Sequence, residues 1–185
     1  MRSRRDIEAL LEELEHCIAD DLEDQDLDFK QWDTQSRDKA VRKVVEMAIC
    51  MANGGGGSVV FGVADRISGR EHAVLGVPQE IDVNILKKAV YDQTDPHITP
   101  VFEELHVPEG TGRVLIMQVH PGMPPHTDTK GGGTIRIGKD CQPLTGTQRR
   151  KIGVETGDTD YTAETLGPVD DAHFSPVALE ALRNL

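Results

Sequence analysis

The run NGGGGSVVFGV, residues 53–63, has the glycine density of a phosphate-binding loop. In such a loop the glycines follow a strand and open a helix, because backbone N–H groups at the helix N-terminus hold the phosphates. Here the order is reversed: the residues before Asn53 have a helical pattern, and residues 58–63 have the pattern of a buried strand. The chain also contains no Gly-Lys-Ser or Gly-Lys-Thr triplet. We therefore predict that the glycines end a helix, and we do not expect an ATPase.

The helix predicted before the glycines carries a cluster of positive charge in its first half. The cluster consists of Arg37, Lys39, Arg42 and Lys43. Cations gathered in this way suit contacts with the phosphate backbone of a nucleic acid. A solvated helix face without a partner is the alternative explanation.

Further cations lie at the last predicted strand, residues 133–138. Arg136 alternates with Ile135 and Ile137, so we expect its side chain to face outward. It would then join Lys139 in a second phosphate contact. Surface charge that only keeps the protein in solution is the alternative.

Other side chains that could recognise bases or metals are sparse. The chain has four Phe, two Tyr and one Trp, and shows no helix-turn-helix, zinc-finger or RNP pattern that would read a sequence. Trp32 is the candidate for base stacking, although we favour its burial beside the first helix. The seven histidines do not cluster as HxH or HxxxH, which argues against a histidine metal centre.

The composition limits the class of partner. Asp and Glu outnumber Lys and Arg by 32 to 20, giving a formal net charge of -12. This balance argues against an indiscriminate binder of polyanions, but it leaves room for a local basic groove.

Cysteine usage and hydropathy indicate the compartment. The chain has three cysteines, Cys17, Cys50 and Cys141. Their number is odd, they lie far apart and no two have CxxC spacing, so neither a disulfide framework nor a zinc site is indicated. Cys50 is expected to be a small core residue. No apolar run approaches the ~20 residues of a membrane span. We expect a cytoplasmic protein in a reducing compartment, without a membrane partner.

Hydrophobic spacing predicts the main elements. Apolar residues at steps of three and four predict amphipathic helices over residues 6–19 and 83–91, and a third that begins after the N-cap Ser36 and runs to about Ala52. Strands are predicted over residues 27–30, 58–63, 73–75, 101–107, 113–120 and 133–138.

These elements predict an α/β (α+β) fold, with a mixed β-sheet packed against helices and an extra N-terminal helix. We divide the chain into an N-terminal helix, a main domain, a polar linker and a C-terminal helix that could begin a further part of a longer protein. Their ranges are 1–19, 20–152, 153–174 and 175–185.

Five blocks in this order resemble the Schlafen AlbA-2 domain over roughly residues 20–145. The blocks are LDFK at 27–30, MANGGG at 51–56, SVVFGVAD at 58–65, PP at 124–125 and TIRIG at 134–138. In that family the glycine block is a turn and packing feature of an α/β fold. The resemblance implies nucleic acid, DNA or RNA, as partner, since prokaryotic members are described as DNA-binding domains of regulator-like proteins.

Some animal members of the family are similar to endoribonucleases with three carboxylates. The resemblance carries these positions onto Glu23, Asp28 and Asp65. Carboxylates that converge from two strand ends can hold Mg²⁺ or Mn²⁺, which would activate water and stabilise charge on the scissile phosphate. Asp28 stands where the family usually has Glu. Lys30 follows two residues later and would lie on the same side as Asp28, either to contact a phosphate or to form a plain surface pair.

We favour a nucleic-acid-binding domain of a transcriptional-regulator or defence protein. The first alternative is a divalent-metal-dependent endoribonuclease with Glu23, Asp28 and Asp65 as metal ligands and Lys30 as a phosphate contact. The second alternative is an assembly module, whose acidic surface binds a basic protein or another copy of the chain as a homo-oligomer.

Overall fold

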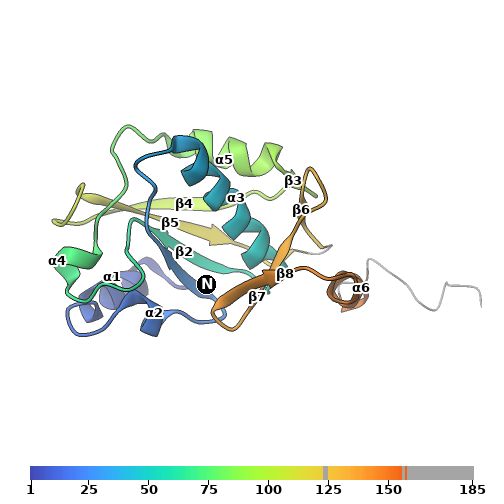
Figure 1. Ribbon diagram of the computed structural model, residues 1–185, viewed down its shortest axis with the longest axis horizontal. Coiled ribbons are helices and arrows are strands. Elements are labelled where there is room, and N and C mark those ends of the chain that lie inside the picture. The colour runs from blue at the N-terminus through green and yellow to red at the C-terminus, as the bar shows by residue number, and fades with distance from the viewer. Residues whose placement is uncertain (123–124, 156, 158–185) are drawn as a thin grey trace, which may run out of the picture.

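The computed structural model describes residues 1–122, 125–155 and 157 (Figure 1). The predicted C-terminal helix, and most of the predicted linker, lie outside the described residues. None of the helices in the described part combines the length and the apolar character that crossing a bilayer requires.

A four-stranded mixed sheet forms the centre of the molecule, with the strand order β1-β2-β5-β4. β1 and β2 are parallel, and the other neighbours are antiparallel. The strands are β1 (Leu27–Lys30), β2 (Gly57–Phe61), β4 (Val101–His106) and β5 (Arg113–Val119). Two small antiparallel pairs lie beside this sheet. They are β3 (Thr94–Asp95) with β6 (Thr127–Asp128), and β7 (Thr134–Ile137) with β8 (Asp140–Pro143). The predicted α+β fold with a mixed sheet is confirmed.

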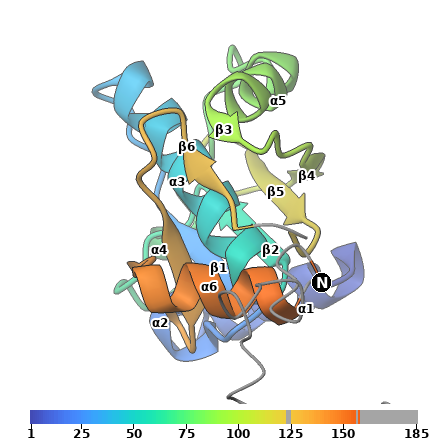
Figure 2. The same cartoon turned by 90° about the vertical axis from the view of Figure 1, so that its right-hand side faces the viewer.

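Helices cover both faces of the sheet (Figure 1, Figure 2). On one face α3 (Arg37–Asn53) and α5 (Val83–Asp92) enclose the larger hydrophobic core. On the other face α1 (Arg4–Glu13) packs into the second core. Three shorter or peripheral helices complete the fold: α2 (Ala19–Leu22), α4 (Arg70–Ala73) and α6 (Gly146–Glu155).

The alternation of β1 determines where its polar residues lie. Leu27 and Phe29 are buried in the core under α1. Successive side chains of a strand point to opposite faces, so Asp28 and Lys30 lie on the face that α3 covers. This is the face on which the candidate site is built.

The glycine run ends α3, as predicted. Ser36 caps the start of the helix by accepting a hydrogen bond from the Lys39 N–H, and Gly54 follows its last residue. Gly56 has φ +83°, and a Cβ there would lie 2.8 Å from the carbonyl oxygen of Val119. The run is thus a tight turn into β2, in which Gly54, Gly56 and Gly57 leave no room for a Cβ atom.

Several local predictions are wrong. Residues 70–73 form α4, with an isolated bridge at Val74 instead of the predicted strand over 73–75. The first helix ends at Glu13, well before residue 19. Residues 146–155 form α6, where no helix was predicted.

The structure also contains a disulfide bond, which the cysteine spacing did not indicate. Cys50 of α3 is joined to Cys141 of β8 across a sequence separation of 91 residues. The hairpin β7–β8 folds back onto α3 and brings the two Cα atoms to 5.9 Å. Cys50 is therefore a core residue that is cross-linked to Cys141. The expectation from the cysteine spacing, which did not indicate a disulfide, is wrong.

Candidate functional site

The three acidic residues named from the family resemblance come together around one ammonium group. Lys30 Nζ lies 2.5 Å from Asp28 Oδ1, 3.5 Å from Glu23 Oε1 and 3.8 Å from Asp65 Oδ2. β1 supplies Asp28 and Lys30, while Glu23 follows α2 and Asp65 follows β2. These four residues are called the acid–lysine cluster below.

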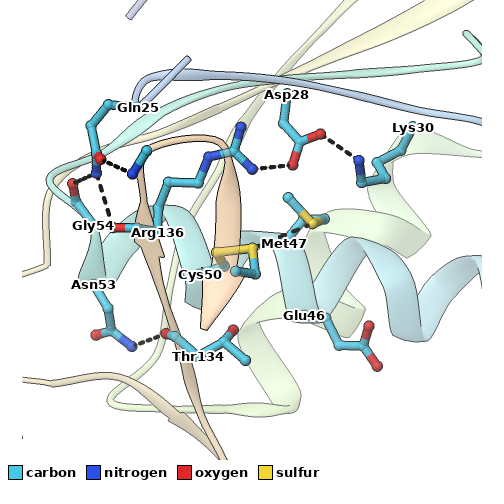
Figure 3. The surroundings of a disulfide bond; sticks show 12 residues. Gln25, Asp28, Lys30, Glu46, Met47, Cys50, Asn53, Gly54, Thr134 and Arg136 are labelled. Carbon is cyan, nitrogen blue, oxygen red and sulfur yellow. Dashed lines mark hydrogen bonds and ion pairs between the residues drawn. A yellow bond between two sulfur atoms is a disulfide. The ribbon is translucent and has the colours of Figure 1, made fainter. Parts of the chain in front are cut away.

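Asp28 lies at the buried end of this cluster, between two cations. Its side chain is 1% exposed, and its second oxygen accepts a hydrogen bond of 2.6 Å from Arg136 Nη1 (Figure 3). Arg136 Nη2 also donates to the carbonyl oxygens of Asp24 and Leu27, at 2.9 Å and 2.7 Å. Both oxygens of Asp28 are therefore already paired.

The prediction that Arg136 faces outward is wrong. The residue is 2% exposed, whereas Ile137 is 50% exposed, so β7 buries its arginine. The physical reason is that the region around the start of β1 presents a buried carboxylate and carbonyl oxygens that can accept a further hydrogen bond, which a guanidinium supplies and an isoleucine cannot. In this structure Arg136 cannot reach a phosphate.

Glu23 changes its charge near neutral pH. Its side chain is 5% exposed, and Oε1 accepts a hydrogen bond from the Phe29 N–H. Burial, followed by the neighbouring Asp28, raises the pKa of Glu23 to about 7, although Lys30 and the Phe29 N–H act in the opposite direction. With Glu23 protonated, the two aspartates balance Lys30 and Arg136.

The two half-buried members of the cluster, Asp65 and Lys30, also have shifted pKa values. Burial raises the pKa of Asp65, and Lys30 opposes this shift. Burial lowers the pKa of Lys30, but Asp28 and the other carboxylates outweigh that effect and leave it above its ordinary value. Lys30 is therefore a permanent cation at neutral pH.

The described arrangement does not fit Mg²⁺ or Mn²⁺. Lys30 fills the space between the carboxylates, and both oxygens of Asp28 are paired with cations. Asp65 Oδ1 is buried without a hydrogen-bond partner, but a divalent ion that bound it would have to displace Lys30 from the same carboxylates. Within residues 1–122, 125–155 and 157, no group of three or more His, Cys, Asp or Glu side chains could hold a metal ion.

The predicted basic cluster forms an exposed face on the first half of α3, here called the basic face. It consists of Arg37, Lys39, Arg42 and Lys43, all exposed. Lys43 pairs with Glu46 at 2.6 Å. The other three make no ion pair with any residue that the structure describes. Lys139 is exposed as well, but it pairs with Asp20 at 2.6 Å.

Two cavities lie along the basic face. The first, of about 350 Å³, is lined by Lys39, Lys43, Trp32 and Phe61 among others. The second, of about 340 Å³, includes Val45, Ile49, Gln93 and Lys130. Arg42 lines both cavities.

Trp32 is buried, as favoured from the sequence. It is 5% exposed and packs edge to face on Phe61, with the ring centroids 6.2 Å apart. The sequence analysis missed Gln31, Gln93 and Lys130 as lining residues of the cavities. They come from loops far apart in the chain, and no local pattern marks them.

Solved structures resemble this fold at low sequence identity. The DIP2311 protein from Corynebacterium diphtheriae matches with a TM-score of 0.59 and 22% identity, over 86% of this chain and 33% of that chain. The chain thus spans about a third of the length of that protein. The N-terminal domain of an ATP-dependent DNA helicase RecG-related protein from Nitrosomonas europaea gives a TM-score of 0.45 and 22% identity, over 77% of this chain and 93% of that domain.

No protein with curated annotation matches the chain. The family model "Schlafen, AlbA_2", in contrast, matches residues 23–145. This range contains the whole four-stranded sheet, the acid–lysine cluster and the basic face. The chain belongs to the Schlafen AlbA_2 family.

Proposed function

We propose that this protein binds nucleic acid through phosphate contacts along the basic face of α3, as one domain of a longer transcriptional-regulator or defence protein. The observation that carries the proposal is the set of three exposed cations without ion pairs in a chain of net charge -12. Arg37, Lys39 and Arg42 lie within the first two turns of α3, so their positive charges are close together and suit an anionic partner. The family resemblance implies nucleic acid as the class of ligand.

A pair of matched variants tests this proposal. Lys39→Gln/Arg42→Gln removes two cations from the basic face, and both residues are exposed, so the fold should persist. Arg5→Gln removes an exposed cation from α1, on the opposite face of the sheet. In gel-shift titrations with DNA and RNA, the double variant should lose about tenfold in affinity or more, while Arg5→Gln stays near the parent. Equal binding by all three proteins would overturn the proposal, and no shift with any nucleic acid would favour a protein partner.

A catalytic role is the second candidate, because the acid–lysine cluster unites groups suited to phosphodiester cleavage. Glu23 has a pKa of about 7, which suits proton transfer near neutral pH. Lys30 places a permanent positive charge beside it, suited to a developing phosphate charge. The described geometry does not fit a metal ion, so the metal-dependent version of this activity requires Lys30 to move.

Cleavage of labelled structured RNA, with Mn²⁺ or with EDTA, tests the catalytic role. The parent protein is compared with Asp65→Ala and with Glu23→Gln. Cleavage in EDTA that disappears in Glu23→Gln would support acid–base chemistry without a metal. Cleavage that occurs only with Mn²⁺ and is lost in Asp65→Ala would show that Lys30 moves away and that a metal ion binds between the carboxylates. Intact RNA throughout would leave a binding module.

A further inference from the structure

Arg42 stands between two cavities on the outer side of α3. Their volumes are about 350 Å³ and about 340 Å³. Both lie at the lower end of the range of roughly 300–1,000 Å³ that is typical of small-molecule sites. Each is therefore large enough for a single nucleotide and too small for a duplex. Glu46 also lines both cavities, but its carboxylate is paired with Lys43.

The linings of the two cavities have the same chemical character. The first has apolar atoms from Trp32 and Ala40, and the second from Val45 and Ile49. Each also includes an exposed glutamine, Gln31 or Gln93. Neither glutamine side chain makes a hydrogen bond within the described part of the chain, so both amides are free to bind a ligand.

Carboxylates at the edges of the cavities are partly satisfied by the protein backbone. Asp33 Oδ1 accepts hydrogen bonds from the N–H groups of Gln35 and Ser36, each at 2.9 Å. Asp128 Oδ1 accepts from the N–H groups of Lys130 and Gly132, at 2.9 Å and 2.7 Å. The second oxygen of each aspartate remains suited to the amino group of a base, because carboxylates accept hydrogen bonds from such groups.

We propose that the two cavities receive consecutive bases of an unpaired strand, with Arg42 on a phosphate between them. The ligand is therefore single-stranded nucleic acid, and this inference rests on the proposed function. An apolar surface with free amides matches a base, and a cation without an ion pair matches a phosphate. In a duplex the bases are enclosed by pairing and stacking, so they could not enter the cavities without strand opening.

Fluorescence anisotropy with three labelled probes tests this inference. The probes are a short single strand, its duplex, and the same single strand with abasic sites, which keeps the phosphates and lacks bases. The abasic strand loses the contacts of both bases, so the intact strand should bind at least about tenfold tighter than either other probe. Equal affinity for the intact and abasic strands would overturn the inference while leaving the proposed phosphate contacts in place.

Variants separate base contacts from phosphate contacts. Gln31→Ala and Gln93→Ala should weaken binding of the intact strand several-fold and leave the abasic strand unchanged. Arg42→Gln should weaken both strands, and Arg5→Gln should weaken neither. Circular dichroism of each variant checks the fold, which these exposed positions should not disturb. Salt-sensitive binding in which the affinity for the duplex equals or exceeds that for the single strand would refute this inference and leave the proposed function in place. No binding of any probe would refute the proposed function as well.

Discussion

At the scale of single residues, Glu23 makes the stability of the folded protein depend on pH. Its pKa is raised from 4.5 to about 7 in the folded protein. Between these two values the folded protein holds a proton that the unfolded chain has released. Because the folded state binds more protons there, the free energy of unfolding falls as pH rises from about 4.5 to about 7. The loss is at most about 3.5 kcal/mol, since one pKa unit corresponds to about 1.4 kcal/mol.

Glu23→Gln should remove this pH dependence. A glutamine resembles the protonated acid: it can accept from the Phe29 N–H and donate to Asp28. Urea unfolding of the parent should show lower stability at pH 8 than at pH 5, and the variant should have a smaller difference. Glu12→Gln, an exposed position on α1, serves as the control and should keep the parent's pH dependence. If the free energy of unfolding changed equally with pH in the parent and in Glu23→Gln, the raised pKa of Glu23 would be contradicted.

Arg136 should be the cation whose loss costs the most stability. Arg136→Met leaves the Asp28 carboxylate buried with Lys30 as its remaining ionic partner, and it also removes the bonds to two backbone carbonyls. Removing one partner of a buried ion pair lowers the free energy of unfolding by about 3–5 kcal/mol. Lys139→Met is the matched control on the same hairpin, since its pair with Asp20 is exposed to water and should contribute little to stability. Chemical denaturation of both variants measures the difference, and similar losses would refute a special role for Arg136.

At the scale of elements, the hairpin β7–β8 is held at three points, two on α3 and one at β1. Arg136 binds the end of β1, Cys141 is bonded to Cys50, and Asn53 Nδ2 donates to the Thr134 carbonyl at 2.8 Å. Asn53 is the last residue of α3, where a side chain can satisfy the backbone of a neighbouring strand. The hairpin therefore positions the arginine that completes the acid–lysine cluster.

Removal of the disulfide should loosen this arrangement. Cys141→Ser should lower the free energy of unfolding by about 2–4 kcal/mol, because the cross-link restricts the unfolded chain over a long loop. Urea unfolding with and without a thiol reductant measures this effect. The parent should lose stability on reduction, and Cys141→Ser should be insensitive to the reductant. Cys17→Ser, which alters the free cysteine, should behave as the parent does. A parent that is unaffected by reduction would contradict the prediction.

At the scale of the whole molecule, charge is arranged unevenly. The chain has a net charge of -12, yet α3 presents cations without ion pairs. An anionic polymer is repelled by the rest of the surface. The basic face must therefore be turned toward the polymer for binding, which matters less in a uniformly basic protein.

Salt dependence should report how many phosphates the basic face contacts. With about three contacts to a single strand, the logarithm of the affinity should fall against the logarithm of the salt concentration with a slope of about -2.1, or roughly 18-fold between 50 and 200 mM salt. Arg42→Gln should reduce the slope by about one unit. A slope near zero would show that binding does not use these cations.

The sequence by itself determined the elements whose causes are local. Ser36 caps α3 because its hydroxyl reaches the N–H of Lys39, and the glycines end the helix because only they adopt the turn into β2. Strand alternation likewise predicted that Asp28 and Lys30 share one face. The five sequence blocks identified the family, and the order of strands and helices identified the fold class.

The tertiary structure alone decided the environment of each side chain. Arg136 turned inward because the edge of β1, far away in sequence, presented a buried carboxylate. Cys50 met Cys141 because the hairpin folds back onto α3, and the two cavities formed where separate loops meet that helix. Burial, pairing and pKa depend on neighbours that are distant in the chain, so no local pattern contains them.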